Sequence, residues 1–300
     1  MKEEASLFMG IKVFTDAASN LFASFLKDKN YDIKVLPMTL DVDGKTYLCY
    51  ENEINIEEFS REIYAKMKEG ASIKTSLANP DVWAKAYEEE ISNGNKVIVF
   101  TLASGISGTY NAACLAAEMV NEEAGEEMVH VIDTRTASFG EGMQATYCYD
   151  LIKQGLDFAS VVKKCEEHVW VVRSEFSVDD INFIARTGRV NKFIAKIANL
   201  LNIKVILKGG KDATIQLYKK IYGRVKALKE LASICASKIK GKEQKVYIAH
   251  CNCEDDALKL KNLLNKEGIN NIEIYWYDII TGSHTGPGNI ALFYEGFDRD

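Results

Sequence analysis

Residues 97–120 read VIVFTLASGISGTYNAACLAAEMV and carry the most informative pattern in the chain. An apolar run ends at Leu102, a turn of small residues follows, and an alanine-rich helical pattern begins near Gly108. Ser107 is placed to cap that helix, and the N–H groups around Gly108 and Thr109, with the helix dipole, offer an anion site. The pattern predicts a strand, a turn and a helix. The start of that helix is either an ordinary capped end or a site for a carboxylate or phosphate.

The sequence of this turn does not match three known binding or catalytic motifs. It contains no Lys, as a Walker-type phosphate loop would, and it lacks the GxGxxG spacing of a dinucleotide site. A nucleophile elbow starting at Gly105 would need Gly where Thr109 stands. The turn therefore predicts neither a nucleotide loop nor a nucleophile elbow.

Outward from this stretch, short β-rich runs alternate with helical patterns of ten or more residues, which predicts parallel βαβ units. The expected strands are 11–15, 96–102, 129–133, 245–251 and 272–280, and the expected helices are 56–69, 80–92, 108–122, 140–154, 157–168, 224–239 and 254–267. Residues 206–220 carry a Gly-Gly-Lys-Asp turn between two β-like segments, which predicts an antiparallel hairpin. We expect an α/β protein with a doubly wound parallel sheet in domain 1–165 and an α+β domain with a mixed sheet in 166–300.

Two other predicted strands end in an acidic residue, VFTDAAS at Asp16 and VIDTRTAS at Asp133. Ligands of open parallel sheets bind beyond the carboxyl ends of the strands. Asp16, Asp133 and the turn from Ser104 to Ser107 should therefore share one edge. Each Asp could equally cap the turn that follows it, and we expect both to shape the cleft.

The segment ASIKTSLANPDVW (71–83) is a polar connection into a helix. Thr75 and Ser76 could reach the same edge of the sheet, where two hydroxyls without a basic neighbour would suit a neutral or lightly charged head group. The bland interpretation is an ordinary loop.

The second half adds two candidates. Arg186 and Arg189 flank a Thr-Gly turn, and an amphipathic helix is expected over 191–201. His284 is expected in a Gly-rich loop directly after a strand, where it could exchange a proton near neutral pH or simply be solvated. His and Arg together could handle a phosphate if the fold brings them together.

Composition narrows the function classes. Of 300 residues 47% are hydrophobic and 27% charged, as in a globular protein, and the formal net charge of −6 gives no general attraction to nucleic acid. The sequence shows no secretory signal and no run of about 18 apolar residues, so no membrane insertion is expected. The seven scattered cysteines predict free thiols in the cytoplasm. The run His250-Cys251-Asn252-Cys253 lacks a second cysteine pair, so no metal is expected.

Several segments in order resemble the DegV family, whose members bind fatty acids. The matching segments are IKVFTDAASNL, DVDGKTY, EEFSREIYAKMKEG, KTS, SGISGTYNAA, VHVIDTRTAS, RTGRVNK, LLNIKVIL, GRVKALKEL and SHTGPG. The resemblance implies two α/β domains with a long-chain fatty acid between them and its carboxylate held by Thr75 and Ser107, beside Ser104 and Gly108. In the FakB branch a separate ATP-dependent kinase phosphorylates that carboxylate, which implies transfer roles for Arg189 and His284.

The sequence departs from the family pattern at several positions. Ala17 and Ala103 replace serines, KTSQP becomes KTSLANP, and Thr187 stands in the usual Gly-Gly-Arg turn. Tyr222 stands where an Arg often precedes the later Gly-Arg pair, which bears on the kinase partner. Thr75, Ser107, Arg189 and His284 remain.

The resulting expectation is a fatty-acid carrier that needs no cofactor and presents the carboxylate to a separate kinase. An acyl chain contributes about 0.8 kcal/mol per buried CH₂, so a few hydroxyl contacts to the head group suffice. The alternative is a serine hydrolase using Ser104 or Ser107 with His284. A phosphotransferase with its own ATP site would need a nucleotide loop that the sequence lacks.

Overall fold

The computed structural model describes residues 10–50, 56–191, 194, 196 and 202–299. Four parallel strands form the first sheet, in the order β2-β1-β6-β7. They are β1 (Ile11–Asp16), β2 (Ile33–Leu36), β6 (Lys96–Thr101) and β7 (Val129–Asp133). The predicted strands 11–15, 96–102 and 129–133 are confirmed. The chain leaves β1 toward β2 and later returns to β6 on the other side, so the switch point of this sheet lies between β1 and β6.

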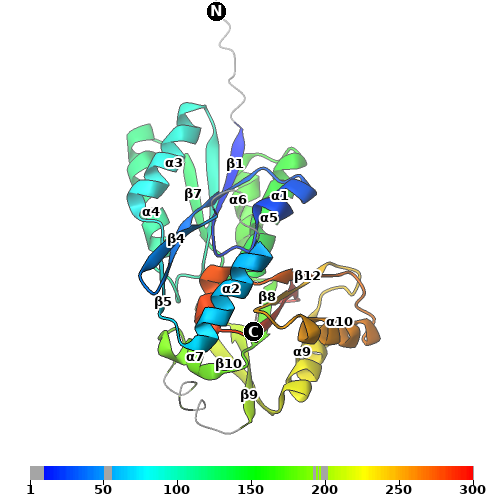
Figure 1. Cartoon of the computed structure of the whole chain (residues 1–300). Helices are drawn as coiled ribbons and strands as arrows, with labels where there is room; N and C mark the ends of the chain where they lie inside the picture. Colours follow the sequence, from blue (N-terminus) through cyan, green and yellow to red (C-terminus); the bar gives the residue numbers. More distant parts are fainter. Residues whose placement is uncertain (1–9, 51–55, 192–193, 195, 197–201, 300) are drawn as a thin grey trace, which may run out of the picture.

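Helices cover both faces of this sheet, as a doubly wound fold requires (Figure 1). α3 (Pro80–Ser92) and α4 (Thr109–Ala124) pack on one face with Phe14, Val97 and Val99. α5 (Phe139–Lys153) and α6 (Phe158–His168) contact β1, β6 and β7 from the other face, where Val13 and Ile98 point. The alternation of side chains along β1 and β6 supplies both apolar faces.

A small antiparallel sheet that the sequence did not predict follows β2. It has the order β4-β3-β5, with β3 (Met38–Val42), β4 (Lys45–Cys49) and β5 (Ile73–Ser76). α1 (Ala23–Lys29) precedes it, and α2 (Ile56–Glu69) lies between β4 and β5. Thr75 therefore lies on a strand, and the expectation of a loop there was wrong, because Leu40 of β3 pairs with Thr75.

The second half contains a six-stranded mixed sheet of order β10-β9-β8-β13-β11-β12. Only β11 and β12 pair in parallel. The strands are β8 (Val172–Ser177), β9 (Ile203–Gly209), β10 (Ile215–Tyr222), β11 (Val246–His250), β12 (Ile272–Trp276) and β13 (Ile290–Glu295). α9 (Arg224–Lys238) and α10 (Glu254–Lys266) pack together beside this sheet (Figure 1). The hairpin and the mixed sheet are confirmed.

Two strand ends differ from the prediction. β12 ends at Trp276, and α11 (Ile279–Thr285) follows because the Asp278 side chain accepts a hydrogen bond from Thr281 N–H and caps it. His284 consequently lies on a short helix, and the expectation of a loop was wrong. β11 ends at His250, and Asn252 takes φ 53°, so the two neighbouring cysteines do not share a strand face.

The two halves meet where α11 contacts α2, β3 and β5 (Figure 1). A Cβ on Gly282 would lie 2.1 Å from the Tyr64 hydroxyl of α2, so this contact requires glycine. α6 ends at His168 and β8 begins at Val172, and the domain boundary near 165 stays a prediction. The expected helix 191–201 lies mostly outside the described residues. Within the described part of the chain, no helix has the length and apolar character to cross a membrane.

Candidate functional site

A cavity of about 420 Å³ lies between the two halves, a volume typical of ligand pockets. Its walls come from the small sheet, the carboxyl ends of β6 and β7, the β9–β10 hairpin, α7 (Ile181–Arg186) and α11. Most of its larger side chains are apolar: Met38, Leu77, Leu102, Ile106, Phe176, Ile184, Ile215, Ile280 and Phe293. Such a lining favours a ligand with a long apolar part.

Polar side chains from the two halves meet in this cavity. Thr75 Oγ1 of β5 lies 2.9 Å from His284 Nε2 of α11, within hydrogen-bonding distance. Burial, and secondarily the charge of Arg189, lower the pKa of His284 from 6.5 to about 4. The imidazole is therefore neutral near pH 7, and a neutral ring can both donate and accept a hydrogen bond.

Ser107 reaches the same cavity from the turn before α4. Gly108, and not Ser107, is the N-cap residue of the helix, so the predicted cap is displaced by one position. Ser107 Oγ accepts a hydrogen bond from Thr109 N–H at 3.2 Å and lies 2.8 Å from Thr109 Oγ1. Since the Thr109 N–H is used in this way, it is not available to an anion. With Thr109 Oγ1 as the second donor, Ser107 keeps its own hydroxyl proton for a ligand.

Ser104 and the two strand-end carboxylates build the turn. Asp133 accepts hydrogen bonds from Ser104 N–H at 3.1 Å and from Ser104 Oγ at 2.5 Å. Asp16 accepts from the N–H groups of Ala18 at 2.8 Å and Leu102 at 3.1 Å. Both carboxylates shape the cleft as the sequence predicted. Ser104 lines the cavity, but its hydroxyl donates to Asp133 and is therefore not free to donate to a ligand in the cavity.

The serine–histidine pairs of the hydrolase alternative are not formed in the described structure. Ser104 bonds to Asp133, Ser107 to Thr109, and His284 to Thr75. A nucleophilic serine needs a base within hydrogen-bonding reach. The geometry therefore supports a binding site better than a Ser–His hydrolytic site.

Arg189 lies at the edge of the cavity. Its side chain is exposed, and its Nη1 donates to Thr187 O at 2.6 Å. Together with Thr75 and His284, it also lines a second hollow that adjoins the cavity. The structure thus brings Thr75, Ser107, Arg189 and His284 to one cavity, although they come from four separate segments.

The closure of the cavity by the β9–β10 hairpin was not predicted from the sequence. Ala213 and Thr214 at the β9–β10 turn line it, and a Cβ on Gly105 would lie 2.6 Å from Ala213 O. Glycine at position 105 lets the two turns touch. Arg135 lines the cavity as well, and its Nη1 donates to Lys211 O in the same turn. The left-handed φ of 55° at Arg135, two residues after the end of β7, gave no distinct sequence signal.

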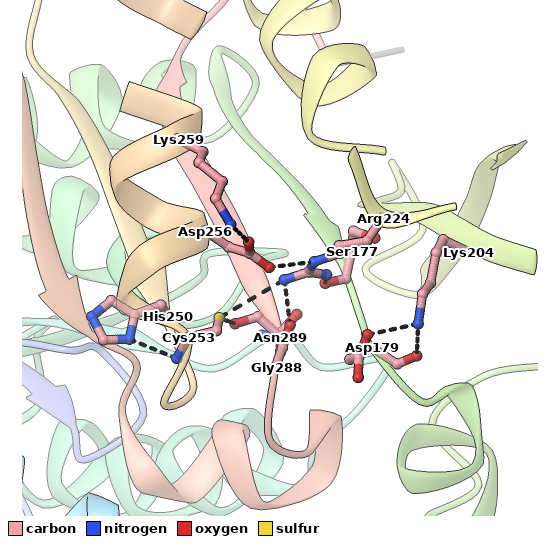
Figure 2. A network of polar contacts seen from close by, with 10 residues as sticks. All are labelled: Ser177, Asp179, Lys204, Arg224, His250, Cys253, Asp256, Lys259, Gly288 and Asn289. Carbon is pink, nitrogen blue, oxygen red and sulfur yellow. Dashed lines mark hydrogen bonds and ion pairs between the residues drawn. The ribbon is translucent and has the colours of Figure 1, made fainter. Parts of the chain in front are cut away.

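Arg224 of the GRVKALKEL segment fixes the chain behind α11, as Figure 2 shows. Its Nη2 donates to Gly288 O at 2.7 Å, its Nη1 to Ser177 O at 3.3 Å, and its Nε to Asp256 at 2.8 Å. The guanidinium therefore joins α9, α10, the end of β8 and the segment after α11. It positions the helix that carries His284 without lining the cavity.

Three buried carboxyl groups lie where the halves join: Asp16, Glu141 and Asp278. Asn20 Oδ1 accepts a hydrogen bond from Asp278 N–H at 2.6 Å and from Ser138 Oγ at 2.8 Å, which joins Asp278 to the segment before α5. Burial raises the pKa of Asp16 to about 6 and that of Asp278 to about 7. Burial and the nearby Asp16 raise the pKa of Glu141 well above its usual range. The three carboxyl groups therefore influence one another's protonation in the protein interior.

The His250–Cys253 run does not converge on one point. Cys251 Sγ accepts from the Tyr64 hydroxyl at 3.1 Å, whereas Cys253 Sγ faces Asn289 O at 3.3 Å. Among the described residues, no group of three His, Cys, Asp or Glu could hold a metal ion. All seven cysteines are free, and five of them are buried.

The fold and the site together define a class: two-domain α/β proteins that enclose an apolar cavity with a hydroxyl and imidazole end. A family model described as "Uncharacterised protein, DegV family" matches residues 10–296. The chain belongs to the DegV family, and the resemblance seen in its motifs is confirmed.

Relatives and solved structures agree with this assignment. A DegV domain-containing protein of Clostridium perfringens is 31% identical over 290 residues, covering 96% of this chain and 98% of its own length. A fatty-acid-binding DegV family protein of Thermus thermophilus has a TM-score of 0.83 and 26% identity, covering 96% of this chain and 100% of its own. A DegV family protein of Ruminococcus gnavus, described with vaccenic acid, has a TM-score of 0.82 and 25% identity, covering 95% and 99%. The predicted two-domain fold is confirmed.

Proposed function

We propose that this protein binds one long-chain fatty acid in the cavity between its domains. The neighbour from Thermus thermophilus is described as binding fatty acid. The single observation that carries the proposal is an apolar cavity in which Thr75, Ser107 and His284 gather. Each buried CH₂ contributes about 0.8 kcal/mol, so the chain supplies most of the affinity. Hydroxyl and imidazole donors suffice for the carboxylate.

The head group belongs at the end where Thr75 and Ser107 lie. A carboxylate there accepts hydrogen bonds from both hydroxyls and displaces the Thr75–His284 contact. Gly108 lines the cavity beside Ser107 and lets the head group approach the helix start. Ser104 takes a supporting role in this proposal, because Asp133 already binds its hydroxyl.

We further propose that the protein is a carrier, without cofactor or catalysis of its own, which presents the carboxylate to a separate ATP-dependent kinase in the cytoplasm. Arg189 and His284 favour this idea because they line both the cavity and the adjoining hollow. Tyr222 is 61% exposed at the end of β10 and would alter a partner's docking surface there. The hydrolase alternative lacks support from a hydrogen bond of Ser104 or Ser107 to a histidine among the described residues.

The test is native mass spectrometry of gently purified protein, followed by lipid extraction. We expect one fatty acid per chain. The double variant T75A/S107A should bind oleate or palmitate about 10- to 100-fold more weakly, because hydrogen bonds to a charged group are worth roughly 1–3 kcal/mol. The matched control T46A/S92A removes two exposed hydroxyls elsewhere and should bind as the parent does.

Two results would contradict the proposal. A parent protein that carries no lipid and takes up no added fatty acid has no acyl site. If T75A/S107A binds as tightly as the parent, the carboxylate lies elsewhere.

A further inference from the structure

The cavity wall carries a pair of hydroxyls outside its head-group end. Thr136, in the segment after β7, and Ser174 of β8 both line the cavity, and they come from different halves of the chain. Thr136 Oγ1 donates a hydrogen bond to Ser174 Oγ at 3.2 Å. We call Thr136 and Ser174 the hydroxyl pair. The lipid proposal gives this pair no role, because an unsubstituted acyl chain has no polar atom to offer it.

Two glycines leave room for the hydroxyl pair. A Cβ on Gly209 of β9 would lie 3.1 Å from Ser174 Oγ, closer than an ordinary van der Waals contact. A Cβ on Gly140 would collide with Thr136 Oγ1. The main chain also holds Thr136, since its carbonyl accepts a hydrogen bond from Ala103 N–H at 2.9 Å. The pair is therefore fixed in position on the cavity wall.

The hydroxyl proton of Ser174 is left without an acceptor. A serine hydroxyl has one donor and two acceptor sites, and Ser174 uses one acceptor site for Thr136. Within the described part of the chain, the Ser174 hydroxyl donates to no acceptor. An acyl chain packed against Ser174 excludes solvent and leaves this donor unsatisfied, which lowers affinity. An oxygen on the ligand at this point would accept the proton.

The hydroxyl pair lies away from the head-group end, which is at the end of α11. Arg224 donates to Ser177 O at 3.3 Å and to Gly288 O at 2.7 Å, so the end of β8 lies beside the segment that follows α11 (Figure 2). A strand rises about 3.3 Å per residue, which places Ser174 roughly 10 Å back along β8 from Ser177. Phe176 faces the cavity between them. An acyl chain that starts at the head-group end thus passes an aromatic ring before it reaches Ser174.

The hydroxyl pair suits an uncharged oxygen. Arg135 lines this part of the cavity, but its Nη1 donates to Lys211 O and its guanidinium lies over the Trp170 ring at 4.8 Å. Its donors are thus directed at the β9–β10 turn and Trp170, and the pair itself offers only neutral groups. A ligand hydroxyl can accept the Ser174 proton and donate its own, so it matches both kinds of site that the pair leaves open.

We propose that the preferred ligand is a hydroxylated fatty acid, with a hydroxyl near the middle of its acyl chain bound by the hydroxyl pair and its carboxylate at Thr75 and Ser107. This inference rests on the proposed function and names the substrate class of the same cavity. An unsubstituted fatty acid still binds through the apolar lining, but it leaves the Ser174 proton unsatisfied. The cavity therefore discriminates in favour of the hydroxylated chain.

Isothermal titration calorimetry of the delipidated protein tests this preference with stearate, 2-hydroxystearate, 10-hydroxystearate and 12-hydroxystearate. We expect at least one of the two mid-chain hydroxy acids to bind about tenfold more tightly than stearate, because a hydrogen bond replaces an unsatisfied donor. The hydroxyl of 2-hydroxystearate lies beside the carboxylate, so this acid should bind about as stearate does.

Variants of the hydroxyl pair locate the preference. S174A should abolish it and should bind stearate at least as tightly as the parent, because a methyl group suits an acyl chain. T136V keeps the shape of the side chain and removes the group that orients Ser174, so it should reduce the preference. The control S92A removes an exposed hydroxyl of α3 and should keep the preference of the parent.

The inference is overturned if neither mid-chain hydroxy acid binds more tightly than stearate, or if S174A keeps the preference. An equal gain for 2-hydroxystearate would also overturn it, since that hydroxyl stays at the head-group end. Loss of stearate binding in S174A would overturn it as well, by showing that the pair only holds the two halves together. A parent that binds none of the four acids would instead refute the proposed function.

Discussion

Replacing Asp278 with Asn should change how the stability of this protein depends on pH. Burial raises the pKa of this carboxyl from 3.8 to about 7, so the folded chain keeps a proton that the unfolded chain has lost. Unfolding then releases a proton, and the free energy of unfolding falls as pH rises from about 4 to 7. With these two pKa values, the loss between about pH 5 and pH 8 is roughly 2–3 kcal/mol. D278N cannot ionise and removes this part of the slope, while its side-chain oxygen can still cap α11.

Urea denaturation of parent and D278N at about pH 5 and pH 8 measures this difference. The charged neighbours of Asp278 are Asp16 and Glu141, so the remaining slope of D278N has the same sign and a smaller size. The control D180N changes an exposed Asp that caps α7 and should leave the slope of the parent unaltered. Equal slopes for D278N and the parent would show that the buried carboxyl is ionised throughout, which refutes the argument.

Three further predictions concern the seam between the domains. G282A should lower the free energy of unfolding in urea by about 1–3 kcal/mol, because the added methyl group overpacks against the Tyr64 hydroxyl. Y64F should restore part of that loss, and an equal loss in both backgrounds would contradict the contact. Arg224 does not line the cavity, but R224M should weaken fatty-acid binding in an equilibrium titration, because it releases the chain behind α11. Unchanged affinity would exclude this positioning role. R189A should keep its lipid by mass spectrometry and lose transfer by about 10²-fold with a kinase. H284A should lose in both assays, because its imidazole is also a donor at the head-group end of the cavity. Lipid loss in R189A would contradict this division.

The sequence alone predicted the parts of the fold that depend on local pattern. The strand, turn and helix of residues 97–120 appear as β6 and α4, because apolar runs, small turn residues and alanine-rich repeats act over a few residues. The hairpin at 206–220 followed from its Gly-Gly turn in the same way. The candidate site residues were identified from the family motifs.

Local pattern failed where a long-range contact decides the conformation. The segment ITGSHTG (280–286) has the composition of a loop. Most of its residues have only moderate helix propensity, and Gly282 disfavours a helix. In the structure, Asp278 caps this segment, and Gly282 packs against Tyr64 from a distant helix. Likewise β5 has only four residues, IKTS, and it is paired along its length with β3, whose sequence Met38–Val42 alternates between apolar and polar residues.

The order of the elements, the family and the set of polar residues available to a ligand thus follow from the amino-acid pattern. Only the tertiary structure brought Thr75 within 2.9 Å of His284, which lies 209 residues further along the chain. Only it joined Lys74, Arg186 and Arg189 around one hollow. The physical reason is that packing of α11 against α2 and the small sheet fixes both the distance and the burial, and burial sets the neutral state of the imidazole.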